Sequence, residues 1–245
     1  MNSFIKLYNA NVYYADLIVK KIIDILNKFN LLNNTYLIIT SDHGEHLGEK
    51  DLWEHHTRLS VYESVIRVPL ILYHSSFKKK IINEQVELKN LFDTILHLTD
   101  IPTEKNIYLQ IENSLLYRIK NGKFADYIFG EYLKSSEEKR IIQKYRKFIR
   151  QNLILKIISD IRFLRTKNFK YINYGNRIEE FYDLINDPNE NTNIFNKNNE
   201  ICQKMRNKLI WMVNENKKTD KLKIMRTKRE KSLIKDIIKQ KKFKI

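Results

Sequence analysis

Apolar residues at helical and strand spacing divide the first hundred residues into alternating elements. Apolar side chains at 12, 15, 19, 22, 23, 26 and 29 recur every three or four residues and predict an amphipathic helix over about 9–29. The runs TYLIIT (35–40) and VPLILYH (68–74) are apolar without alternation, as in strands buried on both faces. A second helix is predicted over 86–102, ending before Pro102. Together these elements predict an α/β fold with a mainly parallel sheet flanked by helices.

The pattern changes in the second half of the chain. Segments 125–133, 161–174 and 179–194 predict a strand, a hairpin, and a strand that runs into an Asp-Pro turn, whereas 135–158 and 199–215 predict helices. These elements indicate a small α+β subdomain. We therefore expect an α/β part over 1–120, the subdomain over 121–215, and a basic tail, helical or frayed, over 216–245.

The charge of the chain is concentrated at one end. Of the net +16, a net +10 lies in residues 217–245, so the rest of the chain is only mildly basic. We expect no specific nucleic-acid binding from the main part, although a non-catalytic basic module that binds nucleic acid or membrane through this tail remains an alternative. No apolar run reaches the roughly 18 residues of a membrane span, and the first residues lack a signal-peptide pattern. The compartment stays open, with the cytoplasm as the default.

The stretch IITSDHGEHLGEKDLWEHH (38–56) carries the candidate chemistry. Asp42 and His43 follow a predicted strand, and loops at the carboxyl ends of strands form the sites of such sheets. Their carboxylate and imidazole together suit a divalent cation, and Gly44 allows a tight turn after them. His55 and His56 could hold an anion or protonate a leaving group. From the residues alone, a simple capped turn and a functional site are about equally supported.

Several segments resemble the sulfatases of the alkaline phosphatase superfamily. TYLIITSDHGEHLGEKDLWEHH followed by YESVIRVPLIL is similar to the metal-binding stretch of that family, and LFDTILHLTDIP to the helix after it. IRFLRTKNFKYI and EEFYDLINDPNENTNI resemble its C-terminal strands. The segments occur in family order over about 10–215. The resemblance implies part of an alkaline-phosphatase-like domain, corresponding to its C-terminal half.

The resemblance assigns roles to four residues. Asp42 and His43 match the family's metal ligands, which implies a divalent cation: calcium first, with magnesium or manganese as alternatives. His55, counted without gaps from His43, falls where relatives carry a side chain that contacts the sulfate or phosphate. His56 takes that position if the chain is about two residues longer here. His46 matches a variable position and is expected to be a solvated loop histidine.

The family's nucleophile motif, Cys/Ser-x-Pro-x-Arg, does not occur in the sequence. Pro69, Pro102 and Pro188 are its only prolines and none has that context, while Cys202 reads as a core cysteine. We therefore expect a sulfuric ester hydrolase represented by its metal-binding and C-terminal portions, inactive alone, with a missing N-terminal half as partner. Its substrate is expected to be a sulfate ester or phosphoester. The nearest alternatives are a phosphodiesterase, a phosphonate hydrolase or a phosphoethanolamine transferase of the same superfamily.

Overall fold

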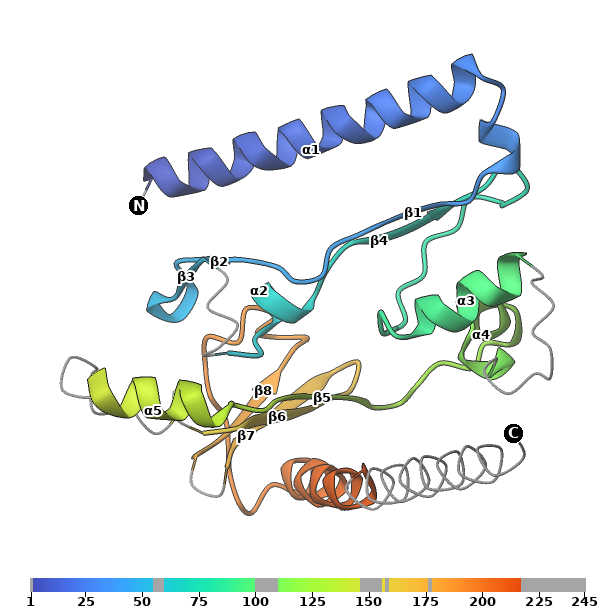
Figure 1. Ribbon diagram of the computed structural model, residues 1–245. Coiled ribbons are helices and arrows are strands. Elements are labelled where there is room, and N and C mark those ends of the chain that lie inside the picture. The colour runs from blue at the N-terminus through green and yellow to red at the C-terminus, as the bar shows by residue number, and fades with distance from the viewer. Residues whose placement is uncertain are drawn as a thin grey trace, which may run out of the picture. The chain divides into compact units, whose positions relative to one another are not determined.

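The computed structural model describes residues 2–54, 60–99, 110–145, 156, 159–175 and 178–216 (Figure 1). The chain divides into two compact units, 1–195 and 196–245. The helices of the first unit are α1 (Asn2–Lys28), α2 (Glu63–Ile66), α3 (Asn90–Thr99), α4 (Leu115–Asn121) and α5 (Ser136–Tyr145), with the 3-10 turns η1 (Leu32–Asn34), η2 (Glu49–Asp51) and η3 (Ile111–Asn113). Its strands are β1 (Leu37–Thr40), β2 (His46–Leu47), β3 (Trp53–Glu54), β4 (Leu70–Tyr73), β5 (Ile128–Tyr132), β6 (Ile161–Arg165), β7 (Phe169–Tyr174) and β8 (Ile178–Asp183).

Helix α1 confirms the predicted amphipathic helix and begins seven residues earlier than the apolar pattern alone suggested. A Lys20–Asp24 pair, 2.8 Å apart at i,i+4 spacing, lies on its polar side. Many of its apolar side chains are nevertheless exposed to solvent: Leu7, Val12, Tyr13, Tyr14, Ile18, Ile22 and Ile25. The helix therefore carries an apolar face that the described part of the chain leaves largely uncovered.

Strands β1 and β4 pair antiparallel, so the predicted parallel arrangement is wrong for this pair (Figure 1). Leu37 lies opposite Tyr73 and Thr40 opposite Leu70. Parallel neighbours need a crossover of a dozen or more residues, usually a helix. Between β1 and β4 the described residues form only short turns, the β2–β3 pair and the four-residue α2, and so offer no crossover helix. The strands are also half-buried rather than buried on both faces.

Strands β5 to β8 form a separate four-stranded antiparallel sheet in sequential order. The prediction of a strand, a hairpin and a further strand in this region is confirmed, and α5 confirms the first part of the helix predicted over 135–158. The strands were expected to be distinct from the first sheet, and no hydrogen-bonded pairing among the described strands joins the two. The division at residue 120 itself stays a prediction.

The main apolar core joins this sheet to a segment a hundred residues away. Its buried members are Val61, Tyr62, Ile161, Phe163, Ile172, Tyr174, Tyr182 and Leu184. Val61 and Tyr62 come from the chain just before α2, and the rest come from β6, β7, β8 and the turn after β8. The core thus places residues 60–66 directly on the β5–β8 sheet.

The second unit holds a helix over 200–216, which confirms the helix predicted at 199–215. Cys202 is fully buried, as expected for a core cysteine, and Met205 and Leu209 share its burial, whereas Ile201 is exposed. The predicted basic tail, 217–245, lies outside the described residues. None of the helices that the structure describes is long and apolar enough to span a membrane.

Candidate metal centre

The turn after β1 brings the carboxylate of Asp42 and the imidazole of His43 together. Asp42 Oδ2 lies 3.8 Å from His43 Nε2, and the Asp42 side chain is 88% exposed. Asp42 Oδ1 accepts the backbone N–H of His43 at 3.0 Å, and the Ser41 hydroxyl donates to the His43 carbonyl at 2.7 Å. Both predicted ligands therefore lie at the carboxyl end of the strand, as the sequence indicated, and they face one another.

The donor atoms of this turn fit a divalent cation. His43 Nδ1 lies 2.8 Å from the Gly44 carbonyl oxygen, which can only accept, so this contact favours the neutral tautomer with its proton on Nδ1. One cation bound at roughly 2.1–2.5 Å from a carboxylate oxygen and an imidazole nitrogen can bridge a separation of 3.8 Å. Among the described residues no group of three or more potential ligands gathers, and the turn itself offers two donor side chains.

Gly44 seats this turn on α2. Its N–H donates to the Val65 carbonyl at 2.7 Å. A Cβ added to Gly44 would lie 2.1 Å from the Ser64 carbonyl oxygen, far inside van der Waals contact. Only glycine allows the backbone after Asp42 and His43 to approach α2 so closely.

We expect Gly44→Ala to lower the free energy of unfolding by about 1–3 kcal/mol, because the new methyl group meets backbone that cannot rotate away. Urea denaturation followed by circular dichroism measures the change. An unaltered unfolding midpoint would show that the turn and α2 separate easily.

His46 is buried, contrary to the prediction of a solvated loop histidine. It is fully inaccessible to solvent. Its Nε2 lies 2.7 Å from the Ser60 hydroxyl and its Nδ1 lies 2.9 Å from the Ser64 hydroxyl. Serine hydroxyls can donate or accept, so both ring nitrogens are satisfied in either neutral tautomer. His46 therefore links β2 to α2 through Ser64 and to the residues before α2 through Ser60.

The other two predicted site residues, His55 and His56, lie outside the described residues. Their roles toward substrate stay predictions. The described chain is fixed on both sides of them by the contacts of Lys50 and of Tyr62.

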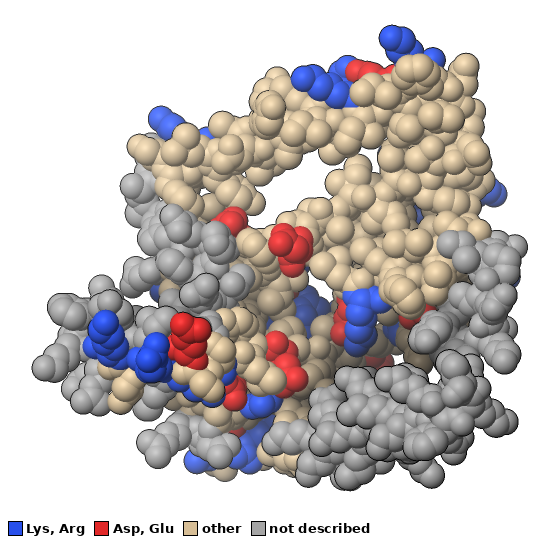
Figure 2. Space-filling model, in the orientation of Figure 1, with Lys and Arg blue, Asp and Glu red and all other residues tan. Residues whose placement is uncertain are grey.

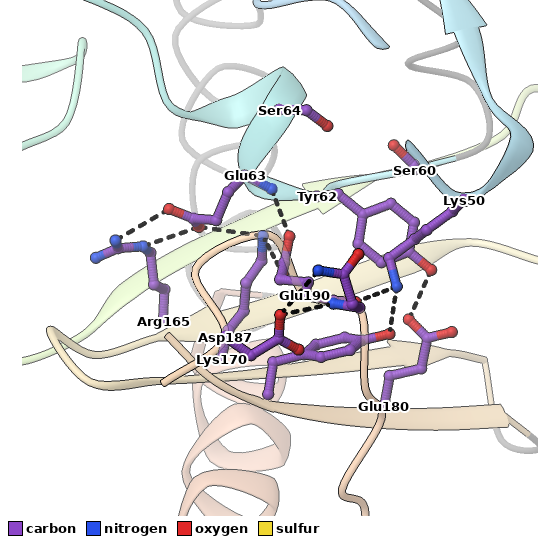
Figure 3. Close-up of polar contacts among 12 residues, drawn as sticks. Lys50, Ser60, Tyr62, Glu63, Ser64, Arg165, Lys170, Glu180, Asp187 and Glu190 are labelled. Carbon is purple, nitrogen blue, oxygen red and sulfur yellow. Dashed lines mark hydrogen bonds and ion pairs between the residues drawn. The ribbon is translucent and has the colours of Figure 1, made fainter. Parts of the chain in front are cut away.

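A buried ion-pair cluster underlies α2, and the sequence did not reveal it (Figure 3). Lys170, with a side chain that is 0% exposed, lies 3.2 Å from Glu63 Oε1 and 3.0 Å from Glu190 Oε1. Burial alone would raise the pKa of Glu63, but the charges of Lys170 and Arg165 and their hydrogen bonds outweigh it and lower that pKa. Burial raises the pKa of Glu190, and the charge of Lys170 offsets this rise only in part.

A second set of contacts surrounds Lys50. Its ammonium group lies 4.6 Å from the ring centre of Tyr62 and 4.7 Å from that of Tyr182, and it donates to the Glu190 carbonyl. Burial lowers its pKa, against the attraction of Glu180 and Glu190. This cation–π cage fastens the η2 turn to the β5–β8 sheet.

Comparisons with known proteins relate the chain to sulfatases. Residues 2–101 match the Sulfatase family model. Over 190 residues the chain is 27% identical to a sulfatase of Formosa agariphila. The aligned region covers 76% of this chain and 31% of that sulfatase. These matches confirm the resemblance to the sulfatase family.

Solved structures extend the likeness of this sulfatase-like chain to its fold. BT4656, solved in complex with its substrate D-glucosamine-2-N,6-O-disulfate, superposes with a TM-score of 0.60 at 23% identity, over 84% of this chain and 39% of that one. The phosphonate monoester hydrolase of Agrobacterium radiobacter gives a TM-score of 0.58 at 18% identity, over 82% of this chain and 39% of that one. The predicted partial alkaline-phosphatase-like fold is thereby confirmed, and the chain spans about a third of the length of the Formosa sulfatase.

Proposed function

We propose that this sulfatase-like chain supplies the cation-binding turn and the C-terminal part of a metal-dependent sulfuric ester hydrolase. The observation that carries the proposal is the 3.8 Å approach of Asp42 Oδ2 and His43 Nε2 at the carboxyl end of β1, within the residues that match the Sulfatase model. Two adjacent ligands on a glycine-anchored turn give a cation a defined place to bind.

Calcium is the cation that we propose first, with magnesium and manganese as alternatives. The exposed Asp42 carboxylate is a hard ligand, and such cations prefer shells rich in oxygen. A bound cation stabilises the charge that develops on the oxygens of the transferring group. Asp42 and His43 hold and orient it, and the proposed partners of substrate are His55 first and His56 second.

The substrate class that we propose is a sulfate ester. Support comes from the Sulfatase family match and from the sulfatase relative. The structural likeness to a phosphonate monoester hydrolase favours phosphoester or phosphonate chemistry as the second candidate, since the same Asp-His pair serves an anionic ester of similar shape. Both kinds of ester have a tetrahedral, anionic centre rich in oxygen, so the identity of the nucleophile decides between them.

We further propose that the nucleophile and the remaining strands come from polypeptide outside these 245 residues, on the same or a second chain. The sequence holds no Cys/Ser-x-Pro-x-Arg motif. The surface also supports this proposal: apolar side chains of α1 and β4, including Val12, Ile22 and Ile71, are about half exposed. In Figure 2 the charged side chains of α1 lie along its upper edge, and the rest of its visible face is uncharged. Exposed apolar area of this extent is typical of a surface that another segment covers.

The proposal is tested by an aryl-sulfate hydrolysis assay with added calcium. The 245-residue chain alone is expected to show no turnover, because a covalent route needs the nucleophile. The chain co-expressed with the remaining part of the Formosa agariphila sulfatase, or with its own flanking sequence, is expected to show calcium-dependent turnover. Metal-dependent turnover by the chain alone, lost on Asp42→Ala, would refute the shared site.

A further inference from the structure

Glu63 is the first residue of α2, and its carboxylate contacts side chains of the β5–β8 sheet (Figure 3). Arg165 on β6 donates to it through Nε and Nη2, at 3.0 Å to each carboxylate oxygen. Lys170 on β7 donates to Oε1 at 3.2 Å, and the backbone N–H of Glu63 donates to Glu190 Oε2 at 2.6 Å. A bidentate guanidinium pair with a further buried ammonium is among the strongest and most directional contacts that a carboxylate makes.

The same four-residue helix also contacts the Asp42–His43 turn. The Gly44 N–H donates to the Val65 carbonyl at 2.7 Å, and Gly44 packs against the Ser64 carbonyl. The Ser64 hydroxyl bonds His46 at 2.9 Å, two residues after the glycine. Residues 63–65 therefore contact the sheet through one side chain and the candidate ligand turn through backbone.

A helix of this length has no stability of its own, so its position follows from its contacts. Tyr62, the residue before α2, provides a contact from a neutral side chain, in which its hydroxyl donates to the Glu180 carboxylate at 2.9 Å. Glu63 provides the charged contact, with its side chain 8% exposed and paired across 102 residues of sequence. The charged contact fixes orientation as well as distance, because its two parallel hydrogen bonds admit one alignment of carboxylate and guanidinium.

We propose that Glu63 is a positioning residue: by locking α2 onto Arg165 and Lys170, it holds the Asp42–His43 turn in the arrangement that a cation needs. The coupling runs from the sheet through Glu63 to Val65, and from there through Gly44 to the imidazole of His43. Its functional meaning rests on the proposed cation site, whereas the coupling itself is a property of the chain alone.

Two spectroscopic signals report the state of the turn without any cation. The first is hydrogen exchange of the Gly44 amide, which is protected only while it donates to Val65. The second is the pair of imidazole ¹⁵N shifts of His43, which show whether the proton stays on Nδ1, next to the Gly44 carbonyl. A loss of global stability alone would not change the His43 tautomer in the folded protein.

The test compares the ¹⁵N-labelled full chain with its Glu63→Gln variant. Glutamine keeps the shape and removes the charge that binds Arg165 and Lys170. We expect Gly44 exchange to accelerate at least about tenfold relative to amides of β6 and β7, and the His43 tautomers to become mixed. Arg165→Lys, a milder change that keeps the charge but loses the bidentate geometry, should accelerate Gly44 exchange about threefold.

Glu131→Gln is the matched control, because it removes a carboxylate that pairs with Arg162 at 3.1 Å on the same sheet. It should leave both signals at their wild-type values. The inference is overturned if Glu63→Gln and Arg165→Lys leave Gly44 and His43 unchanged. The inference is also overturned if hydrogen exchange in Glu63→Gln accelerates equally for Gly44 and for the amides of β6 and β7 while His43 keeps its tautomer. Glu63 would then contribute to global stability only.

A calcium chloride titration of the same samples separates this inference from the proposed function. We expect the Asp42 and His43 resonances of the wild type to respond, and the affinity to fall about tenfold in Glu63→Gln, which corresponds to about 1.4 kcal/mol. Equal affinity in wild type and variant would overturn the inference. If the wild type gave no response while the exchange results held, the metal role would fail and the positioning would stand.

Discussion

Replacing Lys170 by Met is expected to destabilise the chain by about 3–5 kcal/mol at neutral pH. The Lys170 side chain is 0% exposed and pairs with Glu63 and Glu190, two carboxylates that are themselves buried. Methionine fills a similar volume but leaves both carboxylates without this cation, and a buried charge that loses its partner bears the full cost of desolvation. Urea denaturation at pH 7 measures the difference.

The difference in unfolding free energy between the wild type and Lys170→Met should become smaller as the pH falls. The folded-state pKa of Glu63 is lowered, so the stability it contributes is present above the ordinary value of 4.5 and is lost as the pH falls through the lower folded value. The pKa of Glu190 is raised, so its contribution is present below 4.5 and is lost as the pH rises through its folded value. Without Lys170 both carboxyl groups are protonated more readily in the folded state. Lowering the pH therefore removes more of the cost of burying them in the variant than in the wild type.

Lys167→Met is the control for this experiment. Lys167 lies in the same hairpin and pairs with Glu84 at 2.9 Å, but both side chains are well exposed. An exposed pair contributes roughly 0–1 kcal/mol, and we expect a change within that range. If Lys170→Met were no less stable than Lys167→Met between pH 4 and pH 8, the cluster would not hold the fold together.

Asp42→Ala is expected to abolish ester hydrolysis in the complemented protein, with a fall of at least about a thousandfold. The carboxylate is one of the two described donors of the turn, and the cation that it would hold supplies several kcal/mol of charge stabilisation. His55→Ala should slow turnover and His56→Ala should matter less. The measurement is aryl-sulfate hydrolysis with calcium, beside calcium titration of the same protein.

Asp126→Ala provides the matched control, because Asp126 is an exposed aspartate on the loop before β5. Its turnover should equal that of the unaltered protein. Retention of activity in Asp42→Ala, with calcium still required, would move the metal site away from the turn after β1.

The sequence indicated the elements better than their pairing. Helical and strand periodicity is local, so α1, the β6–β7 hairpin and β8 could be located from it. The antiparallel pairing of β1 and β4 was also within reach, because no helical pattern separates the two apolar runs and a parallel pair needs a crossover. The family resemblance supplied the fold as a whole, whereas the pairing of these two strands could have been inferred from the local pattern.

The candidate site was predictable only where it is local. Asp42 and His43 are adjacent in sequence, so their approach required no tertiary contact. The burial of His46 depends on serines 14 and 18 residues later, and the role of Glu63 on residues more than 100 positions away. One feature of the sequence could have indicated that Lys170 is buried. It lies at two-residue spacing from Ile172 and Tyr174 on β7, and all three are buried on the same face.

The ion pair between Glu63 and Arg165 has a consequence for the order in which the chain is made. The partners are 102 residues apart, and the ribosome adds about 5–20 residues per second. The turn with Asp42 and His43 therefore leaves the ribosome several seconds before β6 and β7 exist to hold α2. During that interval Glu63 has neither Arg165 nor Lys170 to pair with, so a nascent chain that ends before β6 lacks the charged contact that holds α2.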